Sequence, residues 1–73
     1  MNFITDRNKA PKNLHYNVSN NLGDINVNFG KNQDEAYKFA ESMKETAIIR
    51  GWYYYKDRGK WAKCTIFIDH IFR

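Results

Sequence analysis

The stretch GWYYYKDRGKW, residues 51–61, brings five aromatic rings and four charged side chains into eleven residues. Exposed rings stack on nucleobases, and neighbouring lysines and arginines neutralise phosphates, which is the chemistry of single-stranded nucleic-acid binding. Trp, Tyr and Arg also carry much of the energy of protein–protein contacts. The candidate binding residues are Tyr53, Tyr55, Lys56, Arg58, Lys60, Trp61 and Lys63.

Catalytic chemistry finds little support in the chain. His15 and His70 have no metal-like spacing, and Cys64 has Ala62 and Ile66 as its neighbours on the same strand face, as a packed thiol does. No glycine-rich phosphate loop is present, and the glycines fall where turns or element ends are expected. We therefore expect a non-enzymatic protein with no catalytic residues, no cofactor and no metal site.

Length and composition predict one small domain in a reducing compartment. The chain has 73 residues and one cysteine, so neither a disulfide nor a cysteine-rich zinc finger can support the fold. The N-terminus is polar, and no apolar run is long enough for a membrane span. We expect residues 1–12 to form a loose arm, residues 13–73 to form the domain, and the protein to be cytoplasmic.

Charge is concentrated near the C-terminus. Residues 1–50 hold seven basic and six acidic side chains, whereas residues 51–73 hold five and two. The net charge of +4 therefore comes mostly from the C-terminal third of the chain, which contains the aromatic stretch.

Two alternating runs predict a first β-hairpin. Apolar residues occupy every second position from Leu14 to Val18 and again from Ile25 to Phe29, with an Asn/Gly turn between them. This hairpin should have one apolar face and one neutral polar face.

Helix signals bracket residues 33–50. Asn32 is a favourable N-cap with Glu35 three residues later, and Gly51 suits the C′ position. At 100° per residue the apolar positions form one stripe, made of Ala36, Phe39, Ala40, Met43 and Ala47. Ile49 falls on the polar side, so we expect the helix to loosen before Gly51.

A second hairpin is predicted from residues 52–56 and 61–72 around the turn 57–59. In its second strand, Ala62, Cys64, Ile66 and Ile68 should face the core, and Trp61, Lys63, Thr65, Phe67 and Asp69 should face away. A two-residue turn at Arg58-Gly59 would send Trp52 and Tyr54 outward, and a three-residue turn with a bulge at Gly59 would send Tyr53 and Tyr55 outward. We favour the three-residue turn.

The predicted fold class is therefore α+β, in the order ββαββ: a four-stranded antiparallel sheet of two β-hairpins with one amphipathic helix packed on one face. The other face is left uncovered, and its rings could equally form cross-strand pairs that cover each other, with residues 1–12 folded over them. A homodimer through this face is a third possibility.

Two functions remain open from the sequence. The favoured one is binding of single-stranded nucleic acid through the basic aromatic hairpin. The alternative is inhibition of a host protein through the same hairpin. Short, asparagine-rich, cofactor-free chains are typical of proteins encoded by bacteriophages and mobile elements, and many of these block host enzymes. Such a protein would act in the host cytoplasm. No named nucleic-acid module can be quoted from the chain.

Overall fold

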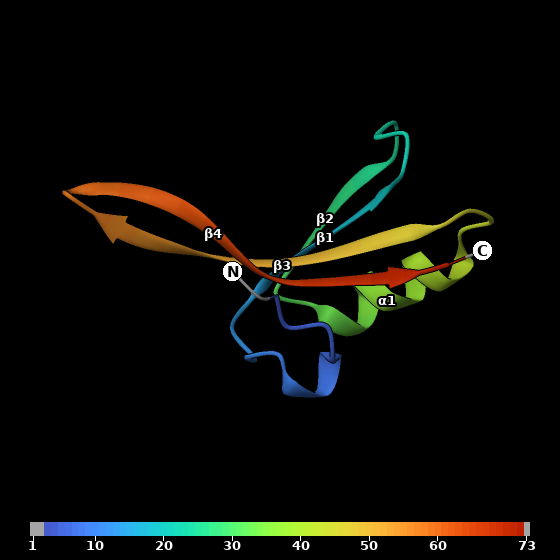
Figure 1. The fold of residues 1–73 in the computed structure, drawn as a ribbon, viewed down its shortest axis with the longest axis horizontal. Helices are drawn as coiled ribbons and strands as arrows, with labels where there is room; N and C mark the ends of the chain where they lie inside the picture. The colour runs from blue at the N-terminus through green and yellow to red at the C-terminus, as the bar shows by residue number, and fades with distance from the viewer. Residues whose placement is uncertain (1–2, 73) are drawn as a thin grey trace.

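The computed structural model describes residues 3–72 and places one α-helix on one face of a four-stranded antiparallel sheet (Figure 1). The strands are β1 (His15–Asn20), β2 (Asn26–Gly30), β3 (Ala47–Asp57) and β4 (Lys60–Ile71), and α1 is Gln33–Ser42. The strand order is β2-β1-β3-β4. The predicted α+β class and ββαββ order are confirmed. Within residues 3–72, no helix has the length and apolar character needed to cross a bilayer.

The core lies between α1 and the neighbouring face of β1 and β3. Its buried side chains are Leu14, Tyr16, Val18, Ala36, Tyr37, Ala40, Met43, Ala47, Ile49 and Phe67. The small alanines of α1 allow the helix to approach the sheet closely, as the apolar stripe predicted. Phe39 is half-buried at the edge of the core and packs its ring 5.5 Å from that of Phe29.

The helix ends eight residues earlier than the sequence predicted. Residues 47–50 belong to β3, and the backbone is already extended at Met43, where the N–H donates to the carbonyl of Ala40. The Thr-Ala-Ile-Ile run suits a strand because β-branched side chains lose rotamer freedom in a helix. Alternation in β3 buries both Ala47 and Ile49, which explains why Ile49 did not fit the helical stripe.

The turn between β3 and β4 has two residues, so the favoured three-residue turn was wrong. Asp57 pairs with Lys60, and the intervening Arg58 and Gly59 have φ of 51° and 81°. Two positive φ angles define a type I′ turn, whose twist matches that of the strands it joins. Trp52 and Tyr54 therefore face away from α1, and the expected outward direction of Tyr53 and Tyr55 was also wrong.

A β-bulge in β4 overturns a further prediction, the outward direction of Phe67 and Asp69. Gly51 pairs with Phe67 but Trp52 pairs with Thr65, which leaves Ile66 as an extra residue. The side-chain alternation of β4 therefore shifts at Ile66. Phe67 is fully buried in the core instead of facing away.

Asp69, two residues after Phe67, also points toward the helix. Its Oδ2 accepts a hydrogen bond of 2.6 Å from the Tyr37 hydroxyl on α1. Burial, this hydrogen bond and the Asp69 charge raise the pKa of Tyr37, so the hydroxyl stays a proton donor beyond the pH at which a free tyrosine ionises. The contact connects the helix to β4.

The N-terminal segment, which the sequence suggested as a loose arm, contacts the domain at two places. Ile4 forms a parallel bridge to Phe67, with its N–H donating to Ile66 and its carbonyl accepting from Ile68. A short 3₁₀ helix, η1 (Arg7–Lys9), comes next, and the Arg7 guanidinium lies 4.7 Å from the centre of the Tyr37 ring. These contacts satisfy part of the outer edge of β4 at the bulge.

Asn20 joins the first hairpin to the loop before β3. Its buried side chain accepts hydrogen bonds from the N–H groups of Gly23 and Ile25, at 2.8 and 3.2 Å, and its Nδ2 donates to Asp24 and Glu45. One amide therefore holds the β1–β2 turn and places two carboxylates beside each other.

Asn20→Asp should destabilise the protein by about 3 kcal/mol at pH 7, because it removes the donor and adds a third carboxylate at a buried position. The crowded charges raise the pKa of the new carboxyl in the folded state, so the loss should shrink as the pH falls toward about 4. Urea unfolding across this pH range measures the effect. Asn21→Asp, at the exposed next position, is the control and should cost less than about 0.5 kcal/mol. A loss that does not depend on pH would contradict this assignment.

Candidate functional site

The outer half of the β3–β4 hairpin projects from the domain as a two-stranded arm, defined here as residues 52–65 (Figure 1). The molecule measures 42 × 27 × 23 Å along its principal axes. None of the buried core side chains of the described chain comes from the arm. At its root Tyr53 packs against the core, and towards the tip the arm presents both of its faces to the surroundings.

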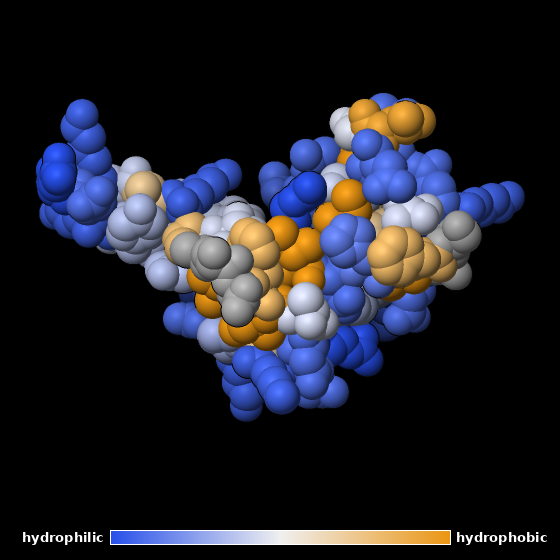
Figure 2. Space-filling model, viewed as in Figure 1, coloured by the Kyte–Doolittle hydropathy of each residue, from blue (hydrophilic) through white to orange (hydrophobic). Residues whose placement is uncertain are grey.

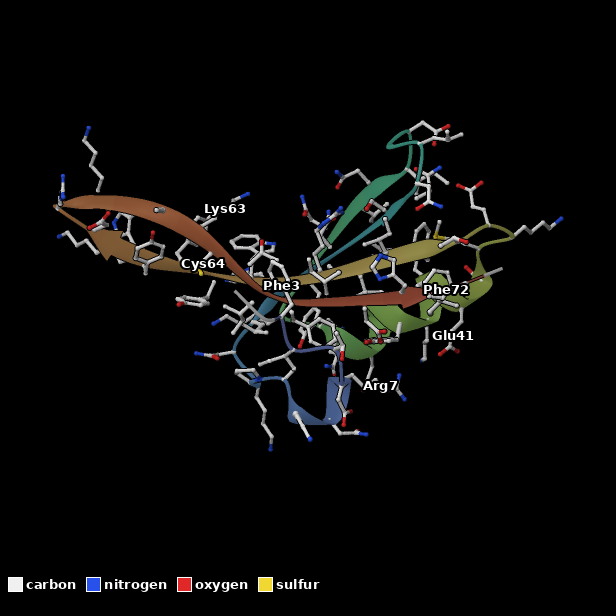
Figure 3. All side chains as sticks on the ribbon, viewed as in Figure 1. Phe3, Arg7, Glu41, Lys63, Cys64 and Phe72 are labelled. Carbon is white, nitrogen blue, oxygen red and sulfur yellow. The ribbon has the colours of Figure 1, made fainter. Side chains whose placement is uncertain are left out.

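The open face is defined here as the side of the sheet away from α1. On the arm it carries the side chains of Trp52, Tyr54 and Lys56 from β3, and Trp61, Lys63 and Thr65 from β4. Figure 3 shows Lys63 and its neighbour Cys64 on opposite sides of the arm, as strand alternation requires. The predicted outward positions of Trp61 and Lys63 are confirmed.

Tyr54 and Trp61 form an aromatic crevice on the open face. Lys63 lies directly across from Tyr54, and Trp61 is two residues from Lys63 on the same strand, so the two rings are diagonal neighbours. They line an apolar hollow of about 300 Å³, and their exposed fractions are 50% and 70%. The crevice offers two ring surfaces to a flat ligand.

Trp52 is held in place at the root of the arm. His15 of β1 stacks on it with ring centres 4.5 Å apart, and the Nζ of Lys63 lies 4.4 Å from the centre of the Trp52 ring. These two partners come from the strands on either side of β3. The Trp52 ring is therefore a support for Lys63, while Tyr54, which contacts it edge-on, remains half exposed.

Tyr53 and Tyr55 lie on the other face of the arm, opposite the aromatic crevice. They pair with Cys64 and Ala62, and their rings contact each other at 6.2 Å. A hydrogen bond to Cys64 raises the pKa of Tyr53. Cys64 is only partly buried, because the arm extends beyond the core that would have covered it. The structure thus separates these two predicted site residues from Trp61 and Lys63.

The remaining predicted cations gather at the tip of the arm. Lys56 pairs with Trp61 across the strands, Arg58 is in the turn and Lys60 is the first residue of β4. Figure 2 shows a strongly hydrophilic surface at this tip. Arg58 has the one positive φ among the described non-glycine residues. A left-handed conformation costs an L-residue about 1–2 kcal/mol, so an arginine here needs a reason other than turn stability.

A second hollow lies on the open face where the first hairpin meets the arm. This amide hollow has a volume of about 370 Å³ and is lined by asparagine side chains of β1 and β2 and by Arg50, Trp52, Lys63 and Thr65. The asparagines are Asn17, Asn26 and Asn28. Sequence reasoning described this region only as a neutral polar face, because the pairing of β1 with β3 that brings Arg50 beside the asparagines is not visible in the sequence.

The carboxylates of the described residues all lie away from the open face. Among the described strands, no outward position of the open face holds a carboxylate. The acidic residues lie elsewhere: Asp6 in the N-terminal segment, Asp34, Glu35 and Glu41 on α1, Asp24 and Glu45 beside Asn20, Asp69 against Tyr37, and Asp57 at the turn. The open face is therefore the side of the sheet suited to an anionic ligand.

A wider cleft of about 780 Å³ lies between the N-terminal segment and the start of α1. Some of its polar groups already have partners within the chain, because Gln33 donates to the Tyr16 hydroxyl and to the carbonyl of Arg7. Burial raises the pKa of Tyr16, which keeps this hydroxyl neutral. The cleft brings together cations and the Asp34 carboxylate, so its charge is mixed.

In the part of the chain that the structure describes, no three His, Cys, Asp or Glu side chains come together as a potential metal site. The chain matches no protein-family model, and no similar protein was found among curated sequences or solved structures. The chemistry of the open face is thus the basis on which function has to be argued.

Arg58→Asn should stabilise the protein by about 0.5–1 kcal/mol, because Asn-Gly is the preferred pair of a type I′ turn and asparagine tolerates the left-handed conformation. Urea unfolding of the two proteins provides the measurement. Arg58→Lys, which keeps the charge and the strain, is the control and should leave stability unchanged. An unchanged or lower stability for Arg58→Asn would mean that Arg58 makes a stabilising contact in the turn.

Proposed function

We propose that the protein is a non-enzymatic binding protein for single-stranded nucleic acid, with the open face of the arm as its contact surface. The observation that carries the proposal is the aromatic crevice between Tyr54 and Trp61, flanked by lysines and free of carboxylates. A nucleobase inserted between the two rings would bury flat apolar surface on both sides, and stacking of this kind is worth about 1–3 kcal/mol per base.

The lysines supply the second part of the interaction. Lys56 and Lys63 lie directly across from Trp61 and Tyr54, so each ring has a cation as its immediate neighbour. When a base occupies the crevice, the nucleic-acid backbone would pass these two lysines and also Arg58 and Lys60 at the tip of the arm. A single strand is favoured over a duplex, because only an unpaired base can enter the crevice.

The same surface would suit a protein, since aromatic residues and arginine dominate protein interfaces. This second candidate, an inhibitor of a host protein, shares the arm with the first. A homodimer through the open face would cover Tyr54 and Trp61 and would compete with either ligand. Sedimentation at the concentrations used for binding shows whether the protein is a monomer or a dimer.

Tyr54→Ala should weaken binding to a mixed-sequence single-stranded oligonucleotide by about 1–3 kcal/mol, through loss of one wall of the crevice. Tyr55→Ala is a closely matched control: the ring next in sequence, 41% exposed, on the opposite face of the arm. It should leave affinity nearly unchanged. Fluorescence anisotropy with labelled DNA and RNA at about 50 mM salt measures both. A larger loss of affinity for Tyr55→Ala would place the contact on the face opposite the aromatic crevice and would contradict the proposal.

Lys56→Ala should flatten the salt dependence of binding. Three or four phosphate contacts give a slope of log affinity against log salt of about −2 to −3, and removing one contact should reduce it by about 0.7. Lys38→Ala, the same change on an exposed position of α1, should leave the slope as it is.

The nucleic-acid proposal fails if the wild type binds neither DNA nor RNA at low salt. The protein-binding alternative then becomes the candidate, with Trp61→Ala as the variant that should abolish capture of one specific partner.

A further inference from the structure

The orientation of the three asparagines in the amide hollow is fixed from within the chain. Asn17 Nδ2 donates to the backbone carbonyl of Val27 at 3.2 Å, and a carbonyl can only accept, so the nitrogen of Asn17 must face β2. The two hydrogens of this NH₂ group are shared among the Val27 carbonyl and the side-chain oxygens of Asn26 and, at 3.1 Å, of Asn28. With their oxygens turned toward Asn17, Asn26 and Asn28 keep their NH₂ groups for other partners, and both residues line the hollow.

Two cations join these amides, and both are held by other side chains. Arg50 donates to Ser19 at 2.6 Å, and Ser19 is buried. Lys63 rests on the Trp52 ring. Held side chains lose little conformational freedom when a ligand binds, which favours affinity.

The hollow is therefore rich in hydrogen-bond donors and positive charge. Arg50, Lys63 and the two amides donate, the Thr65 hydroxyl can donate, and no carboxylate lines the hollow. The group that matches such a set is an oxyanion with several acceptor oxygens, and phosphate is the common one in cells.

We infer that the amide hollow is a phosphate-binding site. Lys63 and Thr65 come after Trp61 at two-residue steps along the same face of β4, each step about 7 Å, so the hollow begins beside the aromatic crevice. Resting on the proposed function, the site would hold the backbone phosphate of a nucleotide next to the stacked base. The same chemistry would also accept free phosphate.

Titration of the labelled wild-type protein with inorganic phosphate at low ionic strength tests the site itself, with side-chain amide NMR signals of Asn26 and Asn28 as the readout. Saturable shifts with a millimolar Kd are expected, and chloride at equal ionic strength should not produce them. Absence of saturable shifts would overturn the inference.

Asn28→Asp is the informative variant, because its carboxylate still accepts the hydrogen bond from Asn17 while it replaces a donor by a negative charge. It should weaken phosphate binding at least about tenfold. Asn21→Asp, the same charge change at an exposed turn position, should retain binding. If Asn28→Asp is unfolded, phosphate binding is measured for Arg50→Gln instead, with Lys38→Gln as its control. Arg50→Gln should weaken binding and Lys38→Gln should not. Equal effects of variant and control would overturn the site.

A short oligo(dT) titrated in the same experiment distinguishes the two sources of phosphate. If both ligands shift the same amides, the site takes the nucleic-acid backbone. If inorganic phosphate shifts them and no oligonucleotide binds, the phosphate site stands and the proposed nucleic-acid function fails.

Discussion

The extra residue at Ile66 reconciles two requirements that a regular β4 could not meet together. Phe67 must point toward α1, where Gly51 makes room for it: a Cβ on Gly51 would lie 2.9 Å from the Cβ of Phe67. Strict alternation would then place Lys63 and Trp61 on the same side as Phe67, away from Trp52 and Tyr54. The bulge reverses the faces, so that one sheet has a closed core at one end and an aromatic, cationic surface at the other.

Much of the fold could be predicted because local signals agreed with it. The Asn32 cap, the alternation in the first hairpin and the turn residues Arg58-Gly59 all mark elements that the structure contains. The end of α1 was missed because Ala47 fits both a helical stripe and an alternating strand. The bulge was missed because the even positions from Ala62 to Ile68 are all apolar, so the apolar Phe67 between them was assigned to the outward face. Only the fit of Phe67 to Gly51 shows that the alternation shifts.

The predicted site residues all belong to the β3–β4 hairpin, but the structure divides them between its two faces. Trp61 and Lys63 could be placed from the second strand alone, whereas Tyr53 and Tyr55 depended on the length of the turn, and a difference of one residue exchanges the faces of the whole strand. The amide hollow was beyond sequence reasoning, because its residues come from all four strands and meet only through the β1–β3 pairing.

The separation of the arm from the core has a consequence for how this protein can evolve. Among the described residues, those fully buried in the core lie outside positions 52–65, while the arm is held by backbone pairing, by the anchor at Trp52 and by the packing of Tyr53 against the core. Exposed side chains of the arm can therefore be exchanged at little cost to folding. Mutational drift can therefore change the surface chemistry of the arm while the domain that carries it stays the same.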